Sequence, residues 1–192
     1  MKPYILFLEG SVGVGKSSCC RRLREILPYV TLLDLTGCPD KTDKGKDKTY
    51  KYHSRILQMM EDTFSCQMNY VISRSYMSES VYADRLNLKP YSFEHETRCL
   101  RCELEYLTNF YDIYFVQLTA TEYQLTERLK RDKFEYVEHS VSNALMQQEA
   151  YKEEMRLLAK ECENVKVFEI QNDDLQSTVN TIKDLILSGM IG

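Results

Sequence analysis

The sequence predicts an α/β fold, a three-layer sandwich in which helices flank both faces of a central five-stranded parallel sheet. The main observations are short, nearly continuous apolar runs, typical of strands buried on both faces, and helical patterns that alternate with them. Strands that alternate with helices favour parallel pairing with right-handed crossovers. The strands are expected at Tyr4–Glu9, Val30–Leu35, Asn69–Ser73, Tyr111–Leu118 and Val165–Ile170.

Helical periodicity fills most of the chain between these strands. The first helix follows a glycine-rich turn and runs to about Leu27, where Pro28 breaks the pattern. Thr119–Glu122 predicts a capping box for a helix that ends near Arg131. Because Thr36–Thr49 is polar and rich in Gly, Pro, Asp and Lys, we expect a mobile loop there. The other helices are expected at Tyr50–Phe64, Ser75–Leu86 and Tyr91–Phe110, in a long segment ending near Lys160, and at Leu175–Leu187.

Length and charge limit the classes of protein that the chain can belong to. Its 192 residues are enough for one domain with one core, so we expect a single domain over residues 1–192. The formal net charge of −4 argues against duplex nucleic acid as a partner. No apolar run approaches the ~18–20 residues that a membrane span needs, so we expect no membrane partner.

The seven cysteines are an odd number, and the chain shows no signal peptide. This pattern favours reduced thiols and a cytoplasmic location, in a cell or in an infected host cell. Cys99 and Cys102 form the one close CxxC pair, and no second pair completes a zinc site. Their spacing fits one face of a helix, which is the simpler interpretation.

A phosphate-binding motif follows the first strand. The segment Gly10–Ser17 matches G-x-x-x-x-G-K-[ST] at every required position, and it lies between a strand and a helix, as the motif needs. In such a loop, backbone N–H groups and the helix N-terminus bind phosphate oxygens. Lys16 is placed to reach the β- and γ-phosphates, and the Ser17 hydroxyl is placed to ligate Mg²⁺. We therefore expect ATP with Mg²⁺, held by Gly10, Ser11, Val12, Gly13, Val14, Gly15, Lys16, Ser17 and Ser18.

Missing motifs narrow the choice among proteins with this loop. No N/T-K-x-D motif for guanine is present, and no D-x-x-G follows the strand at Asn69–Ser73, which argues against a GTPase. A hydrophobic strand ending in Asp-Glu, usual in motor ATPases, is also absent. A kinase for a small acceptor remains.

Two arginines near the end of one helix are candidates for binding the phosphate that is transferred. Arg128 and Arg131 lie three residues apart, so they share a helical face. Guanidinium groups carried by a closing flap, expected near residues 128–139, would stabilise the charge on the γ-phosphate and exclude water. The alternative is a solvated basic helix end that complements the helix dipole.

Two further candidates lie where the second and third strands end. In an open parallel sheet, ligands bind at the carboxyl edge, where the phosphate loop also lies. Asp34 could accept a proton from an acceptor hydroxyl, and Arg74 could hold the acceptor's 5′ oxygen or phosphate. The alternatives are a turn aspartate and a structural ion pair.

The helix expected at Tyr50–Phe64 begins with aromatic and basic residues. Tyr52 and His53 could form an aromatic wall for a nucleobase, with Arg55 as a hydrogen-bonding partner. The alternative is that the aromatic side chains belong to the core.

With these residues in hand, the whole chain resembles the deoxynucleoside kinase and thymidylate kinase family, which implies a P-loop kinase fold. The loop Gly10–Ser18 is similar to that of deoxynucleoside kinases, whereas thymidylate kinases commonly carry an acidic residue or Asn in place of Val12. Asp34 falls where deoxynucleoside kinases place a glutamate that is their general base.

Arg74 matches the arginine of the Glu-Arg-Ser and Asp-Arg-Tyr motifs of the two groups. Ser73 stands in place of their acidic residue, which helps to hold Mg²⁺ in the family. This departure puts full activity in doubt, or shifts metal binding to Ser17 and Asp34. An alternative register would align Ser78–Ser80 with the same motif.

Two other segments match the family. Arg128–Glu135 resembles its flap, in which Glu135 would meet the sugar 3′-hydroxyl. Asn172 and Asp173 follow the last strand and resemble the loop that cradles adenine. The family is commonly dimeric, which implies a homodimer through Tyr91–Phe110.

Three functions are compatible with these residues. The first is transfer of the ATP γ-phosphate to the 5′-hydroxyl of a deoxynucleoside such as thymidine, for which Asp34 and Val12 argue. The second is transfer to a deoxynucleoside monophosphate, as in thymidylate kinases. Two segments of this chain, Pro39–Lys46 and Asp132–Glu135, resemble segments of those enzymes. The third is a nucleoside triphosphate-binding protein without kinase activity, which the serine at position 73 would explain. We expect the first.

Overall fold

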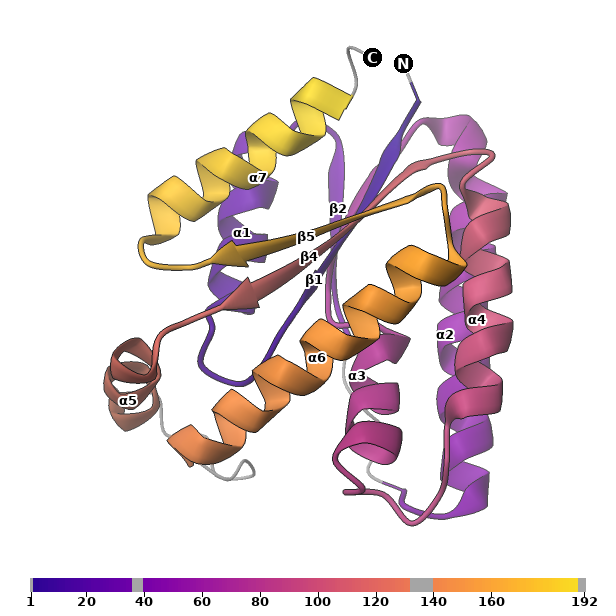
Figure 1. The fold of residues 1–192 in the computed structure, drawn as a ribbon. Helices are drawn as coiled ribbons and strands as arrows, with labels where there is room; N and C mark the ends of the chain where they lie inside the picture. The colour runs from indigo at the N-terminus through magenta and orange to yellow at the C-terminus, as the bar shows by residue number, and fades with distance from the viewer. Residues whose placement is uncertain (1, 36–39, 132–139, 190–192) are drawn as a thin grey trace.

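A parallel sheet forms the centre of the structure, a computed structural model that describes residues 2–35, 40–131 and 140–189 (Figure 1). Its strands are β1 (Tyr4–Glu9), β2 (Val30–Asp34), β3 (Asn69–Ser73), β4 (Asp112–Thr119) and β5 (Val165–Gln171). All neighbouring strands pair in parallel, in the order β2-β3-β1-β4-β5. This confirms the predicted fold class, with every strand boundary within one residue of its expected place.

Helices cover both faces of the sheet (Figure 1). One face is covered by α1 (Lys16–Ile26) and α7 (Leu175–Gly189). The other is covered by α2 (Asp43–Thr63), α3 (Tyr76–Ser80), α4 (Glu94–Leu107) and α6 (Val141–Glu161). Helix α5 (Glu122–Arg131) packs against α6, and two short helices, η1 (Phe64–Cys66) and η2 (Val81–Arg85), extend α2 and α3.

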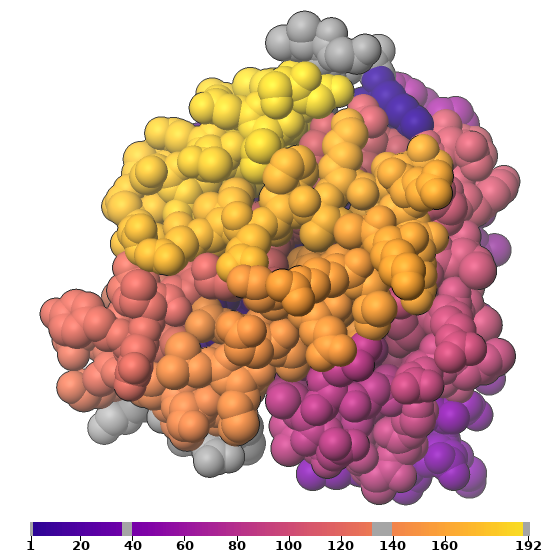
Figure 2. Space-filling view, in the orientation of Figure 1, coloured from indigo at the N-terminus to yellow at the C-terminus, as the bar shows by residue number. Residues whose placement is uncertain are grey.

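The space-filling view shows how this outer layer closes over the sheet (Figure 2). Helix α6, in orange, crosses the middle of the visible face, and α7, in yellow, covers its upper left. Within the described part of the chain, no helix combines the length and the apolar character needed to cross a membrane.

The side chains of β1 divide the core into two layers. Ile5 and Phe7 pack with α2, α3, α4 and α6, whereas Leu6 and Leu8 pack with α1 and α7. All four side chains are buried, and Phe7 stacks on Phe115 of β4 with 4.4 Å between the ring centroids. Because β1 is also paired on both edges, its carboxyl end is held firmly, and so is the start of the loop that follows.

Helix α2 begins earlier than the sequence predicts. The expected mobile loop over Thr36–Thr49 is wrong from Asp43 onward, where the helix starts. Thr42 caps this helix, because its hydroxyl oxygen accepts a hydrogen bond of 3.4 Å from the backbone N–H three residues later. Lys46 forms an ion pair of 3.2 Å with Glu96 of α4. The cap and this contact with α4 favour a helix where composition alone predicts a loop.

Two other helix starts differ from the prediction. The capping box of α5 is formed by Thr121 and Gln124, whose side chains each accept a hydrogen bond from the other's backbone N–H at 3.2 and 2.9 Å. The box predicted at Thr119–Glu122 is therefore wrong, because β4 extends to its first residue. Helix α4 begins at Glu94 rather than at Tyr91.

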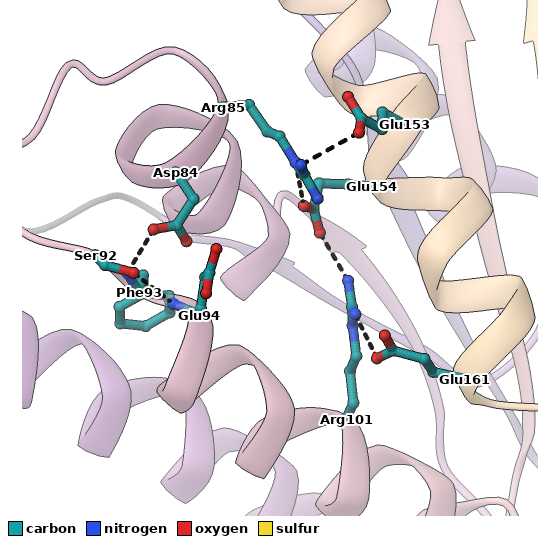
Figure 3. A network of polar contacts seen from close by, with 9 residues as sticks. All are labelled: Asp84, Arg85, Ser92, Phe93, Glu94, Arg101, Glu153, Glu154 and Glu161. Carbon is teal, nitrogen blue, oxygen red and sulfur yellow. Dashed lines mark hydrogen bonds and ion pairs between the residues drawn. The ribbon is translucent and has the colours of Figure 1, made fainter.

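An ion network joins α6 to the helices beside it (Figure 3). The Glu154 side chain of α6 is only 3% exposed, and it accepts hydrogen bonds of 2.7 Å from Arg85 Nε of η2 and from Arg101 Nη2 of α4. Arg101 also pairs with Glu161 at 2.6 Å, and Arg85 pairs with the more exposed Glu153 at 3.2 Å. One buried carboxylate thus connects three helices on one face of the sheet.

We expect Glu154→Ala to lower the free energy of unfolding by about 3 kcal/mol, because it leaves two arginines in a largely buried place without their shared partner. Glu153→Ala is the matched control, and its effect should stay below about 0.5 kcal/mol because that pair is exposed. Urea unfolding of both variants measures the difference. Equal effects would show that Glu154 does not hold the network together.

Candidate active site

The loop between β1 and α1 has the geometry of a phosphate cradle. Gly10, Gly13 and Gly15 have positive φ angles of 135°, 81° and 91°. A Cβ atom on Gly15 would lie only 2.6 Å from Nδ2 of Asn172, so both backbone angle and space require glycine there. Gly15 caps α1 without a side-chain hydrogen bond, so the first N–H groups of the helix are left for an anionic ligand.

The Lys16 side chain folds back onto the start of this loop. Its Nζ atom donates hydrogen bonds to the carbonyl oxygens of Gly10 and Ser11, at 2.6 and 2.7 Å. Burial and the charge of Arg74 together lower the pKa of Lys16 to about 7, although the charge of Glu9 acts in the opposite direction. An anionic phosphate beside Lys16 would favour its charged form.

A cavity of about 330 Å³ opens over the loop. The cavity brings together the loop lysine and four candidate residues from other parts of the sequence. These five residues are Lys16, Arg74, Arg128, Arg131 and Asn172. Four are basic, and none of the described residues that line the cavity is acidic. The local charge is thus opposite in sign to the net charge of the chain, and it suits a polyphosphate.

Arg74 and Asp34 lie at the same edge of the sheet. Arg74 follows β3 directly, has a positive φ of 68°, and donates its backbone N–H to Leu8 O at 3.1 Å. Asp34 is the last residue of β2, paired in register with Ser73. Its carboxylate is exposed and does not line the cavity, although its charge acts on Lys16. Arg74 therefore lines the cavity at the end of β3, and Asp34 lies at the end of the neighbouring strand β2, outside the lining.

Arg128 is braced against the loop. Its Nη2 atom donates to the carbonyl oxygen of Asn172 at 2.6 Å, and its Nη1 atom lies 3.4 Å from Val14 O and 3.5 Å from Gly13 O. Arg131, one helical turn later, lines the same cavity and is exposed. The two arginines predicted to bind the transferred phosphate therefore differ in exposure. Arg128 is half-buried against the loop, whereas Arg131 is exposed to solvent.

The segment after β5 holds the phosphate loop through a hydrogen bond of Asn172. The amide of Asn172 is buried, donates to Val14 O at 2.6 Å and accepts from the Thr178 hydroxyl at 3.0 Å. Asp173 is exposed and accepts hydrogen bonds from Gln124 and Gln171, at 2.9 and 2.7 Å. Asn172 thus fixes the loop's shape, and Asp173 is the one of the two that is open to a ligand.

The candidates on α2 separate onto different faces. His53 is buried, whereas Tyr52 and Arg55 are exposed. The rings of Tyr52 and His53 meet edge to face, with 5.2 Å between centroids. Burial lowers the pKa of His53 to about 4, so this side chain is neutral at pH 7. Residues 36–39 and 132–139, with Glu135 and most of the expected flap, lie outside the described part of the chain.

Two residues near the loop were not predicted. Glu9, the last residue of β1, is fully buried beneath it. A charged residue that ends an otherwise apolar strand is a signal that the sequence did contain. Gln147 of α6 is also buried, and its Oε1 atom accepts the backbone N–H of Val12 at 3.2 Å. No local pattern indicates that contact, because the two residues are 135 positions apart.

The residues present fit magnesium as a partner of the nucleotide. Ser17 is the second residue of α1, is exposed and lines the cavity. Among the described residues, no three His, Cys, Asp or Glu side chains gather into a metal site. Few protein ligands are what Mg²⁺ needs, because it keeps several waters and takes most other ligands from the phosphates.

The parallel sheet, its strand order, and the loop with its lysine at the carboxyl edge define a P-loop kinase fold. The YorR protein of Bacillus subtilis, solved in complex with phosphorylated GDP, is similar with a TM-score of 0.67 and 16% identity over 98% of each chain. A deoxyadenosine kinase from M. mycoides, with its products dCMP and dCDP bound, gives 0.62 and 13% over 96% of this chain and 99% of that one. A thymidylate kinase from Candida albicans gives 0.62 and 12%, over 98% and 93%.

No family model matches the sequence, and no curated protein sequence does. Identities of 12–16% to the solved structures establish the fold and leave the acceptor open.

The protonation of His53 gives a measurable pH dependence. The unfolded chain takes up a proton at a pKa of about 6.5, whereas the folded chain does so at about 4. The folded state is therefore destabilised as pH falls through this window, by about 2 kcal/mol at pH 5. Urea unfolding at pH 7 and pH 5 should show that His53→Gln loses less stability on acidification than the wild type. Equal losses would place the acid sensitivity elsewhere.

Proposed function

We propose that this protein transfers the γ-phosphate of ATP to the 5′ position of a deoxynucleoside. The observation that carries the proposal is the cavity over the phosphate loop, which four basic side chains line, with Asp34 at the end of the neighbouring strand β2. The fold supports it, because the deoxyadenosine kinase and the thymidylate kinase that resemble the chain have the same architecture. A cytoplasmic location and a homodimer through α4 remain predictions.

The residues divide the work of phosphoryl transfer between them. The loop N–H groups and Lys16 bind the β- and γ-phosphates, and Arg131 approaches the transferred group from the open side. Arg128 braces the loop and contributes its charge. When bound, Mg²⁺ supplies positive charge to the phosphates, and Ser17 would hold it.

The acceptor is bound at the edge formed by β2 and β3. Arg74 fixes its 5′ end, and Asp34 accepts the proton of the 5′-hydroxyl. Tyr52 of α2 offers an exposed ring for the base, with Arg55 as a hydrogen-bonding partner, and Glu135 the contact to the sugar 3′-hydroxyl. His53 is buried and neutral, and it packs edge to face against the Tyr52 ring.

A deoxynucleoside monophosphate is the second candidate acceptor. No acidic side chain is among the described cavity residues, and this favours a monophosphate acceptor, because the negative charge of its phosphate would meet no repulsion beside Arg74. Its nucleophile is a phosphate oxygen, largely ionised near neutral pH, so it needs no strong base. A nucleotide-binding protein without transfer is the third candidate, motivated by Ser73.

ADP release should be measured with ATP against a panel of deoxynucleosides and their monophosphates, beginning with thymidine and dTMP. We expect turnover with a nucleoside, and we expect Lys16→Met to reduce it at least about 100-fold because the transferred charge loses its closest cation. The melting temperature should hardly change, since the hydrogen bonds that Lys16 Nζ donates in the described structure go to loop carbonyls and methionine fills a similar volume. A near-wild-type rate for this variant would refute the assignment of the loop.

Asp34→Asn discriminates between the two acceptors. It should reduce transfer to a nucleoside by about 100-fold or more, because the amide cannot take the hydroxyl proton. With a monophosphate acceptor the loss should stay below about fivefold. Asp62→Asn, an exposed aspartate of α2, is the matched control and should be neutral. Equal small losses with every acceptor would remove Asp34 from the mechanism.

A further inference from the structure

The carboxylate of Glu9 is buried without full compensation. Its side chain is 0% exposed. Oε2 accepts a hydrogen bond of 3.2 Å from the Ser78 hydroxyl, which in turn accepts one of 2.8 Å from Tyr151 of α6. Oε1 has no hydrogen-bond partner among the described residues. Burying a carboxylate oxygen in this way costs free energy that the fold does not recover.

The position of Glu9 relates it to two cations of the site. Leu8 of β1 and Ser73 of β3 are paired in register, and Arg74 N donates to Leu8 O. Glu9 and Arg74 are therefore neighbours, each one residue beyond that pair. On the other side the chain passes through the loop to Lys16. The charge of Glu9 acts on both cations.

Opposing influences act on the carboxylate of Glu9. Burial favours its neutral form, and the net pKa is raised to about 7, whereas the hydroxyls of Ser75 and Ser78 and the charges of Lys16 and Arg74 favour the charged form. The hydrogen bond that Oε2 accepts also suits the carboxylate. Lys16 and Arg74 repel each other, and without Glu9 the negative charge that acts on both of them would be lost.

We infer that Glu9 is a positioning residue for phosphoryl transfer, the counter-charge that keeps Lys16 and Arg74 side by side at the edge of the cavity. The effect of Glu9 on turnover rests on the proposed function, whereas its effect on nucleotide binding does not depend on that function. Glu9 competes with the phosphates of ATP for the two cations. Glu9 therefore limits how tightly Lys16 and Arg74 bind ATP before the reaction, and it keeps both cations aligned for the γ-phosphate in the transition state.

Glu9→Gln tests this, because it removes the charge and keeps an oxygen for Ser78. We expect ATP to bind at least threefold tighter by titration calorimetry, since an anion beside the triphosphate is gone. We expect kcat to fall at least tenfold, and the melting temperature to stay equal or rise, because an uncompensated buried charge is removed. Glu9→Asp keeps the charge and should recover part of kcat.

Glu154→Gln is the matched control, a second buried carboxylate at a distance from the cavity. It should lower the melting temperature and leave ATP affinity and kcat unchanged. The inference is overturned if Glu9→Gln behaves like this control, or if it binds ATP as the wild type does or more weakly. If the wild type phosphorylates no acceptor, the proposed function fails, and the ATP affinity of Glu9→Gln alone decides the inference.

Discussion

The burial of β1 on both faces and both edges is the constraint on which the rest of the structure depends. Its neighbours β3 and β4 fix it laterally, and the two core layers fix it from above and below. The chain can therefore leave the strand only at the carboxyl edge of the sheet, where glycines turn it into α1. The ends of β2, β3 and β5 reach the same edge, so residues far apart in the sequence border one cavity.

Charge is distributed unevenly over the molecule. The chain carries a net charge of −4, yet the described residues around the loop are basic or neutral. Acidic groups near the cavity are either exposed at its border, as Asp34 is, or buried beneath it, as Glu9 is. A cavity of this kind attracts polyanions while the rest of the surface repels them, which provides selectivity before any specific contact forms.

Local signals made much of this structure predictable. Continuous apolar runs gave the strands to within a residue, and the glycine and lysine spacing of the loop is a property of a short segment. Contacts across the fold were not predictable. The start of α2 depends on a helix 50 positions away through Lys46 and Glu96, and Val12 meets Gln147 only because α6 crosses the sheet. Periodicity could not show that His53 faces inward while its neighbour Tyr52 faces solvent.

The start of β1 and the end of α7 lie close together at the edge opposite the loop, where Pro3 and Leu187 border one cavity (Figure 1). A short peptide could join these ends, and the chain could be opened at another surface loop to give a circular permutant with the same core. Fusion partners attached beside Pro3 or Leu187 would likewise project away from the cavity over the loop. The architecture thus places the two ends of the described chain at the edge of the sheet opposite the loop.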